Sequence, residues 1–367
     1  MIRVLQMLGS LEAGGAQAVV INIYRNINKK NIQFDFIVDH KEKLFYASEI
    51  EKLGGKIYYL PQFYGWNIFK VIRAWENLFS KHREYNILHV HLGSYARIFI
   101  GIAKIYGLKV IYHSHTADYG KGFKGLLRRV FLYKVQDKCD YLFSCSKEAA
   151  YLQYGSKYRE LKNYFYFPNA IDVNKFIYNP AYRNKYRKKY NWENKFVYVH
   201  VGRFTEAKNH NFLIELFAFI HKNDQNTCLV LIGEGELKNS IIEKVDKMNL
   251  NDSVCFLGNR EDVNCLLSAM DCFLFPSLWE GLPVSVIEAQ ANGLICLISD
   301  KITKDVKITD LITYLPLNQG FQVWIDALKC MKIYNRIIYN RMVANTEFNI
   351  YKSTLWLEKF YQNINNS

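Results

Sequence analysis

Apolar runs of two kinds alternate along this chain, and the alternation limits which folds it can adopt. Short runs such as "IRVLQML" (residues 2–8) and "FDFIVD" (residues 34–39) are typical of strands. Longer segments between them, such as "AQAVVINIYRNI" (residues 16–27), have the apolar spacing of helices. Repeated strand–helix alternation with almost wholly apolar strands predicts a parallel sheet covered by helices on both faces.

The alternation is interrupted once. Residues 179–195, "NPAYRNKYRKKYNWENK", are polar and basic, and we expect a linker with one short helix there. The alternation then restarts, and 367 residues suit two domains. The predicted fold is α/β, with two doubly wound, Rossmann-like domains facing across a cleft. We place them at residues 1–178 and 179–345, with an amphipathic helix at 346–367 that packs on the first domain.

Composition limits the classes of binding partner and the cellular compartment that we expect. The chain carries a net charge of +14, which favours nucleotides, acidic lipid headgroups or nucleic acid without choosing among them. Eight cysteines contain no C-x-x-C pair, so we expect reduced core thiols in a cytoplasmic protein. No signal peptide or membrane-spanning segment is recognisable, which leaves a protein in solution or on the inner face of a membrane.

Ligands of doubly wound sheets bind at the carboxyl ends of the strands. The first strand is followed by "LGSLEAGGAQ", in which Gly15 stands where a P-loop would have its lysine, and the G-x-G-x-x-G pattern is also absent. Gly14 and Gly15 remain at a helix N-terminus, where free N–H groups favour an anion. A tight turn without a ligand is the alternative.

The second domain has charged and glycine-rich loops at several successive strand ends. Arg203 and Lys208 follow its first strand and form a candidate diphosphate clamp, with an ordinary solvated loop as the alternative. Gly233 and Gly235 follow the next strand and would let a ligand approach the backbone. Arg260 follows the third.

The stretch "PSLWEGLPVSVIEAQANG" (residues 276–293) carries two acids, Glu280 and Glu288. Pro283 suits the first turn of a helix and Gly293 its C′ position. Glu280 is then expected on a loop at the cleft and Glu288 about one and a half turns into the helix. Both carboxylates could accept hydrogen bonds from sugar hydroxyls. For Glu288, an ion pair with a lysine is the alternative.

Together with "GRFTEAKN", "GEGEL" and "LGNREDV", this stretch resembles the C-terminal domain of retaining GT-B glycosyltransferases of glycosyltransferase family 4, closest to those that build capsular polysaccharides or exopolysaccharides. "GSLEAGGAQ" and "HSHT" are similar to the acceptor-side domain of the same family, so the resemblance covers nearly the whole chain. It implies a hexosyltransferase that moves a sugar, with retention, from a nucleotide-sugar, expected to be UDP-linked, to a polyprenyl-diphosphate-linked acceptor in bacterial surface polysaccharide synthesis.

The resemblance also implies roles for single residues. Arg203 and Lys208 match the pair that binds the donor diphosphate, Glu280 the acid that holds the donor sugar, and Glu288 the acid that holds the ribose. Further matches are Gly281 and Leu282 beside the sugar and phosphate, Gly15 near the distal phosphate, Arg260 near the base, and His115 near the donor sugar, with His113 as the alternative to His115.

No cofactor and no metal are expected, because the chain lacks the D-x-D motif that anchors a divalent ion on the diphosphate in glycosyltransferases of the other main fold. One pattern leaves a metal open. His89, His91, His113 and His115 alternate at the ends of two strands, so that four imidazoles could surround a zinc ion. No carboxylate or cysteine lies in these short segments, which argues against it.

Two other functions compete. A non-hydrolysing UDP-sugar epimerase would share the fold and the donor site. The positive charge would suit a nucleic-acid-binding protein, but no recognised module interleaves its basic residues with aromatic ones, so no nucleic acid is expected.

The segment 119–138, "YGKGFKGLLRRVFLYKVQDK", has basic residues between apolar residues at helical spacing. This pattern predicts a basic amphipathic helix that binds an anionic membrane surface, or alternatively a helix that packs into the core.

Overall fold

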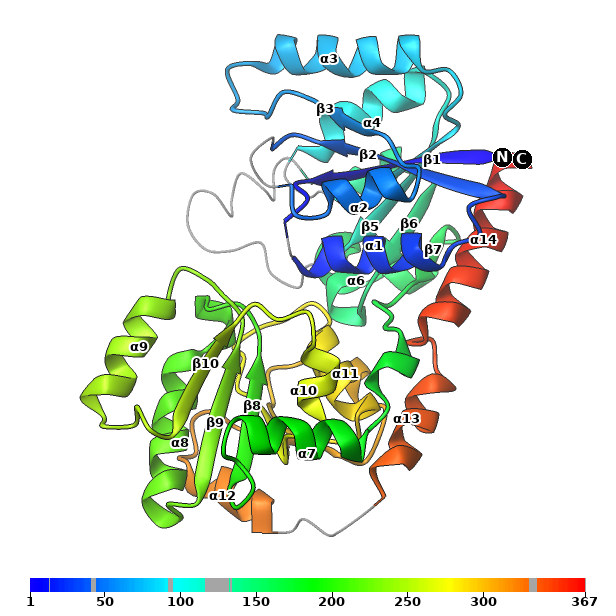
Figure 1. The fold of residues 1–367 in the computed structure, drawn as a ribbon. Helices are drawn as coiled ribbons and strands as arrows, with labels where there is room; N and C mark the ends of the chain where they lie inside the picture. Colours follow the sequence, from blue (N-terminus) through cyan, green and yellow to red (C-terminus); the bar gives the residue numbers. More distant parts are fainter. Residues whose placement is uncertain are drawn as a thin grey trace. The chain divides into compact units, whose positions relative to one another are not determined.

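The computed structural model describes residues 1–12, 14–40, 44–91, 95–115, 132, 134–329 and 335–366. The chain forms two compact units (Figure 1). The first comprises Met1–Ala170 and Ile350–Ser367, and the second comprises Ile171–Asn349. The chain therefore enters the second unit at Ile171, ahead of the boundary expected after residue 178, and returns to the first unit at Ile350.

The sheet of the first unit has seven strands in the order β3-β2-β1-β4-β5-β6-β7. All neighbouring strands are parallel. The strands are β1 (Ile2–Gly9), β2 (Ile32–Val38), β3 (Ile57–Tyr59), β4 (Ile87–Val90), β5 (Lys109–Ser114), β6 (Tyr141–Ser144) and β7 (Tyr164–Tyr166). The described helices are α1 (Gly15–Asn26), α2 (Ala47–Lys52), α3 (Ile68–Lys81), α4 (Ala96–Ile105), α6 (Lys147–Tyr154) and α14 (Ile350–Asn366).

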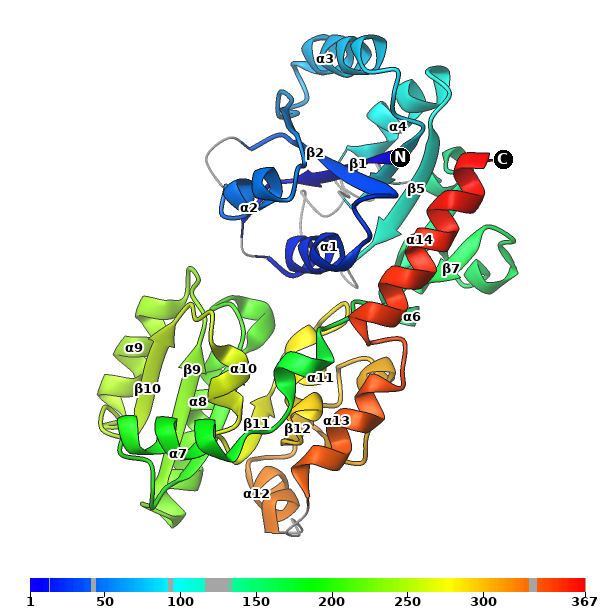
Figure 2. The ribbon, with the colours of Figure 1, turned by 45° about the vertical axis from the view of Figure 1, so that its right-hand side comes forward.

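The two faces of this sheet are covered differently. Leu5 of β1 and Leu88 of β4 belong to an apolar core that also contains Trp75 of α3 and Phe99 of α4. Because side chains alternate along a strand, the residues next to them point to the other face. There α14 packs against β1 and α1 (Figure 2). Its buried Tyr361 contacts side chains of β1 and β4.

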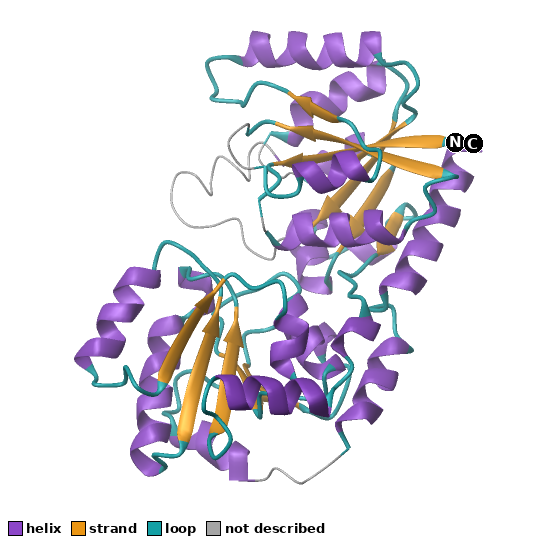
Figure 3. Cartoon of the chain, viewed as in Figure 1, coloured by secondary structure: helices purple, strands orange, loops and turns teal. Residues whose placement is uncertain are grey.

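The second sheet has six strands in the order β10-β9-β8-β11-β12-β13, again parallel. Figure 3 shows helices around these strands. The strands are β8 (Phe196–Val201), β9 (Thr227–Ile232), β10 (Val254–Gly258), β11 (Cys272–Phe275), β12 (Ile295–Ser299) and β13 (Ile312–Leu315). The helices are α7 (Pro180–Lys189), α8 (His210–Asn223), α9 (Lys238–Lys247), α10 (Val263–Leu267), α11 (Val284–Ala291), α12 (Gln322–Lys329) and α13 (Arg336–Ala344). The expected α/β class with two doubly wound sheets is confirmed.

Residues 180–189, inside the expected linker, form the helix α7, which packs on the second unit. Asn179 caps this helix by accepting hydrogen bonds from the N–H groups of Ala181 and Tyr182. Arg183 and Arg187 both reach Asp271, at 2.7 and 2.9 Å. The basic character of this segment is therefore used to attach α7 to the sheet rather than to keep a linker solvated.

None of the seven described cysteines forms a disulfide, and five of the seven are buried. Within the described part of the chain, no helix combines the length and the apolar character that crossing a bilayer requires. Most of the basic segment 119–138 lies outside the described residues. Its described end, Val135–Lys138, is a single 3₁₀ turn with Val135 buried.

Candidate functional site

Four loops follow neighbouring strands of the second sheet, and they carry most of the charged candidates. The strands β10, β9, β8 and β11 lie side by side, and the sequence order reverses between β8 and β11. Parallel strands end at the same edge, so their loops meet there. Arg203 and Lys208 follow β8, Arg260 follows β10 and Glu280 follows β11.

Lys208 and Glu280 form an ion pair, with Lys208 Nζ 2.6 Å from Glu280 Oε1. Their side chains are 17% and 14% exposed, so the pair is largely shielded from water. The Lys208 ammonium also lies 4.8 Å from the centre of the Phe275 ring. Two residues expected to bind different parts of a ligand thus contact each other, and a ligand anion can compete with Glu280 for Lys208.

Backbone contacts hold the loops that carry this pair. The N–H of Leu278 donates to the carbonyl of Ala207 at 2.8 Å. Asn209, in the left-handed conformation with φ 53°, donates from its side chain to the carbonyl of Pro276 at 3.2 Å. These bonds join the loop after β8 to the loop after β11, and so fix the spacing of the pair.

Arg203 differs from Lys208 in its surroundings. Its side chain is exposed, and it forms no hydrogen bond or ion pair within the part of the chain that the structure describes. An arginine in this state keeps all its N–H donors available for an anion such as a phosphate.

Glu288 lies on α11 and is partly buried. Desolvation raises the pKa of its carboxyl group to about 8. The expected alternative, an ion pair with a lysine, does not occur among the described residues. The Glu288 carboxyl group is therefore largely uncharged at neutral pH and has no charged partner among the described residues. These two properties make it a candidate for contact with ligand hydroxyls.

The glycines of the second unit have structural roles that the sequence did not reveal. A Cβ on Gly233, whose φ is +142°, would lie 2.1 Å from the carbonyl oxygen of Gly202. A Cβ on Gly235 would lie 2.6 Å from the backbone of Phe204. Both positions require glycine so that the loops after β8 and β9 can pack together. Gly281 is partly exposed and Leu282 is buried.

Arg260 is paired within its own loop. It donates two hydrogen bonds to Asp262, at 2.8 and 2.7 Å. Asp262 also accepts one from Tyr186 at 2.6 Å. The side-chain hydrogen bond from Arg260 is the main cause that lowers the pKa of Asp262 to about 2. A ligand base would meet an arginine whose orientation is already set.

The remaining candidates belong to the first unit. Gly14 is the N-cap of α1 and provides no side-chain cap, and a Cβ on Gly15 would meet no described atom within 4 Å. His115 follows β5, is partly exposed and contacts His91, with 2.8 Å between His115 Nε2 and His91 Nδ1. His113 is buried and bonded to the carbonyl of Phe167. Of the two histidines, His115 is the one that a ligand can reach.

Sequence reasoning missed His200 and His210, which lie near Lys208. Both are buried, and burial is the main cause that lowers the pKa of His210 to about 4. His200 donates from Nδ1 to the carbonyl of Leu274 and stacks on Phe275. The position of His210, two residues after Lys208 at the start of a helix, was the signal that could have found it.

Comparison with known proteins agrees with this geometry. The family Glycosyl transferases group 1 matches residues 182–308, and the family Glycosyltransferase Family 4 matches residues 13–175. EpsF of Bacillus subtilis (strain 168), which carries a glycosyltransferase name, is 32% identical over 336 residues, covering 89% of this chain and 86% of EpsF. The chain belongs to the glycosyltransferases of group 1 and family 4. This membership favours sugar transfer over the epimerase and nucleic-acid-binding alternatives.

Two further relatives of this glycosyltransferase bear on its fold and ligands. A UDP-Gal:alpha-D-GlcNAc-diphosphoundecaprenol alpha-1,3-galactosyltransferase of Escherichia coli is 29% identical over 233 residues, covering 60% of this chain and 59% of that enzyme. The crystal structure of Anabaena HepE in complex with UDP and glucose superimposes with a TM-score of 0.80 at 16% identity, covering 99% of this chain and 100% of HepE. HepE therefore establishes the shared GT-B fold.

Proposed function

We propose that this glycosyltransferase transfers a hexose from a UDP-sugar, with retention, to a saccharide linked to a polyprenyl diphosphate, in the assembly of a bacterial surface polysaccharide. The observation that carries the proposal is the Lys208–Glu280 pair at the carboxyl edge of the second sheet, with the exposed Arg203 on the same loop as Lys208. Retention rests on the resemblance of the two-glutamate stretch to retaining enzymes.

In the proposed step, the bond between C1 of the sugar and the distal phosphate oxygen breaks. The electron pair stays on the departing diphosphate, while an acceptor hydroxyl bonds to C1 and passes its proton to the departing phosphate oxygen. Negative charge grows on the diphosphate, and Arg203 and Lys208 stabilise it. Glu280, released from Lys208 by the diphosphate, is then able to accept hydrogen bonds from the sugar hydroxyls.

Support for UDP comes from the HepE complex and from the donor in the name of the Escherichia coli relative. Glu288 is assigned to the ribose hydroxyls, and Arg260 lies on the loop proposed to contact the base. The backbone at Gly281 and Leu282 and the loop of Gly233 and Gly235 would line the phosphates and sugar. From the first unit, Gly14 and Gly15 are proposed to approach the distal phosphate and His115 the donor sugar.

The donor site is proposed to work without a metal, since two cationic side chains and helix N-termini neutralise the diphosphate. A polyprenyl-linked acceptor is supported by the name of the Escherichia coli relative, which acts on a diphosphoundecaprenol substrate. Such an acceptor places the enzyme at a bilayer, so we assign it a peripheral position on the inner face of the plasma membrane.

The described structure contains a surface that suits this position. Trp66 and Phe69, next to and on α3, are 84% and 77% exposed, and Tyr64 is 61% exposed. Lys70 and Arg73 are exposed on the same helix. Aromatic rings that insert among headgroups, flanked by cations, are typical of attachment to anionic bilayers. The segment 119–138 would add further cations.

Co-sedimentation with vesicles tests the membrane assignment. We expect the protein to pellet with anionic vesicles at low salt and not with neutral ones. Trp66→Ser/Phe69→Ser should weaken pelleting, as should Lys124→Gln/Arg128→Gln/Arg129→Gln, each without changing UDP affinity. Ile105→Ser, at a residue 82% exposed on α4, is the control for loss of an exposed apolar side chain. Equal pelleting with both kinds of vesicle, or with neither, contradicts the assignment.

A panel of nucleotide-sugars in a thermal-shift assay tests the donor. Specific binding raises the melting temperature by mass action. We expect UDP and one UDP-hexose to raise it, and ADP- and GDP-sugars to leave it unchanged. A larger shift with an ADP- or GDP-sugar contradicts the UDP assignment while leaving sugar transfer intact.

A further inference from the structure

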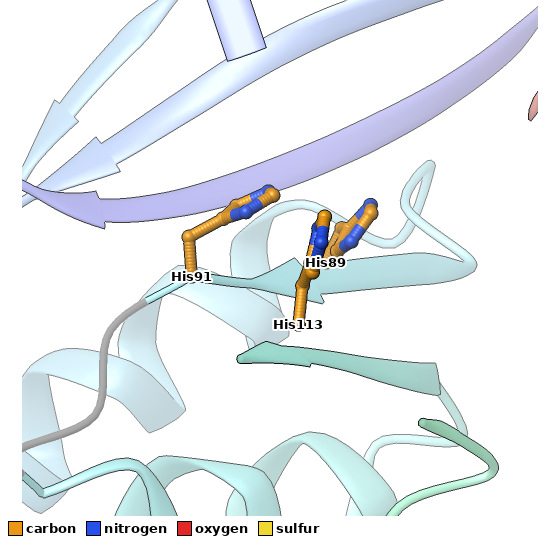
Figure 4. A group of neighbouring side chains, drawn as sticks. All are labelled: His89, His91 and His113. Carbon is orange, nitrogen blue, oxygen red and sulfur yellow. The ribbon is translucent and has the colours of Figure 1, made fainter. Parts of the chain in front are cut away.

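Three imidazoles form a cluster on one face of the first sheet (Figure 4). His89 lies on β4, His91 directly follows it, and His113 lies on β5. The alternate residues Leu88, Val90, Val110 and Tyr112 belong to the core on the opposite face. Strand alternation therefore directs the three histidines to the face covered by α14.

The rings are close enough to share one small ion. One ring nitrogen of each histidine lies within 4.8 Å of one ring nitrogen of each of the others. Among the described residues, this is the one group of three or more possible metal ligands that meets such a distance. Figure 4 shows the His89 and His113 rings side by side and the His91 ring directed toward them.

Hydrogen bonds determine which nitrogens are left to bind an ion. His113 Nε2 lies 3.2 Å from the carbonyl oxygen of Phe167, which can only accept, so Nε2 carries the proton and Nδ1 a lone pair. His91 Nε2 lies 2.9 Å from Gln6 Oε1, so its Nδ1 is the acceptor nitrogen. His89 Nδ1 lies 2.7 Å from the Tyr361 hydroxyl.

Two of these nitrogens have no partner among the described residues. His89 Nε2 and His113 Nδ1 are buried and form no hydrogen bond, and each residue is 2% exposed. A buried polar atom without a partner is unfavourable, because it has given up its hydrogen bonds to water.

The outer contacts match those of known metal sites. A histidine that binds a metal usually donates its other N–H to a carbonyl, carboxylate or water, which fixes the ring. Here Phe167, Gln6 and Tyr361 provide such a contact for each of the three rings. The Phe167 carbonyl, the Gln6 amide and the Tyr361 hydroxyl lie far apart in the sequence of the first unit and meet at this cluster.

We propose that His89, His91 and His113 bind one divalent transition-metal ion, of the class that prefers imidazole and includes Zn²⁺ and Co²⁺. The ion would tie β4 to β5 and, through Tyr361, to α14. Its role is structural and separate from the donor site, which remains metal-free in the proposed function.

Binding requires a small local rearrangement. Metal–nitrogen bonds of about 2.0–2.1 Å require the three nitrogens to lie within about 4.2 Å of one another. His91 Nδ1, which lies 2.8 Å from His115 Nε2, must exchange that contact for the metal. His115 then lies next to the ion, and a water molecule can complete a fourth position.

Cobalt binding to the untagged, full-length protein tests the proposal. Chelator-treated protein without nucleotide is titrated with Co²⁺, and tetrahedral coordination is followed by visible absorption. We expect one equivalent to bind, Zn²⁺ to displace it, and Zn²⁺ to raise the melting temperature. His113→Gln and His89→Gln should each lower Co²⁺ affinity at least tenfold. His221→Gln, at a partly buried histidine of the second unit, should leave it unchanged.

A direct measurement does not depend on whether the variants fold. Wild-type protein purified without chelator from cells supplied with zinc should contain about one zinc per chain by elemental analysis. Less than a tenth of an equivalent, together with no visible cobalt band, overturns the proposal and leaves a neutral imidazole cluster. An unchanged band in folded His113→Gln also overturns it.

Discussion

At the scale of single residues, the central feature is the pairing of Lys208 with Glu280. The carboxylate of Glu280 neutralises the Lys208 ammonium in a largely buried setting. In the proposed function, the donor diphosphate must displace that carboxylate to bind Lys208. Arg203, exposed and without a partner in the described chain, contributes its charge without such competition. In the proposed function, the pair links diphosphate binding to the release of Glu280 toward the sugar.

We expect Lys208→Ala and Arg203→Ala each to lower the transfer rate by about 100-fold or more, which corresponds to roughly 3 kcal/mol of stabilisation of the departing diphosphate. Glu280→Gln should leave UDP affinity within a few-fold of wild type and lower the rate. Initial rates and UDP titrations measure these effects. Wild-type rates in both cation variants contradict the assignment.

The raised pKa of Glu288 predicts that UDP binding releases a proton. With a pKa of about 8 its carboxyl is largely protonated at pH 7, and ribose hydroxyls that donate to it would favour the ionised form. UDP binding at pH 7 should release roughly nine-tenths of a proton, and affinity should rise with pH and level off above pH 8.

Calorimetry of UDP binding in two buffers with different ionisation enthalpies measures this release. The observed heats should differ between buffers for wild type and agree for Glu288→Gln. Equal heats for wild type contradict the ribose assignment. In the free protein, the raised pKa stabilises the fold fully below pH 4.5, and this contribution is lost as the pH rises through about 8.

At the scale of elements, the loops after β8 and β9 depend on glycine for their packing. Gly233→Ala should lower the free energy of unfolding by about 3 kcal/mol or more, because its Cβ would overlap the Gly202 carbonyl at a positive φ. Gly15→Ala, in open space at a helix start, should change stability by less than about 1 kcal/mol. Urea unfolding compares the two, and equal stability of both variants contradicts this account.

The helix α7 makes a second prediction at this scale. Asp271 accepts hydrogen bonds from Arg183, Arg187 and the N–H of Val197, and so joins α7 to β8. Asp271→Asn should lower the free energy of unfolding by about 2–4 kcal/mol, since it leaves Arg187 without a countercharge. Asp252→Asn, at an exposed residue, is the control. A loss below about 0.5 kcal/mol for Asp271→Asn would show that α7 is held mainly by apolar packing.

At the scale of the whole molecule, local sequence patterns were enough to predict the α/β class, both sheets and most helices and strands, because parallel strands are apolar along their whole length. The strand β7 was missed because "YFYF" is short and lies among polar residues, and β13 because it follows a long irregular segment. The short helix expected in the linker is α7, but its attachment to the second unit was not predicted, because its arginines find Asp271 only in the folded unit.

Local sequence patterns predicted the candidate site only in part, because they do not contain the contacts between side chains that lie far apart in the sequence. Position after a strand placed Arg203, Lys208 and Glu280 on loops at one edge of the sheet, since topology brings strand ends together. The contact between Lys208 and Glu280, seventy-two residues apart, depends on side-chain conformations that no local pattern contains. The unpartnered nitrogens of the histidine cluster likewise depend on Phe167, Gln6 and Tyr361, which approach only in the folded chain.

The most direct test of the proposed activity is transfer itself. The protein is incubated with the UDP-hexose that gives the largest thermal shift and with a polyprenyl-diphosphate-linked sugar, and the lipid product is followed by mass spectrometry. We predict a product heavier by one hexose with the α-configuration of the donor retained, formed in the presence of a chelator and reduced about 100-fold in Lys208→Ala. No lipid product with any UDP-hexose that the protein binds, or equal product from Lys208→Ala, would contradict the account.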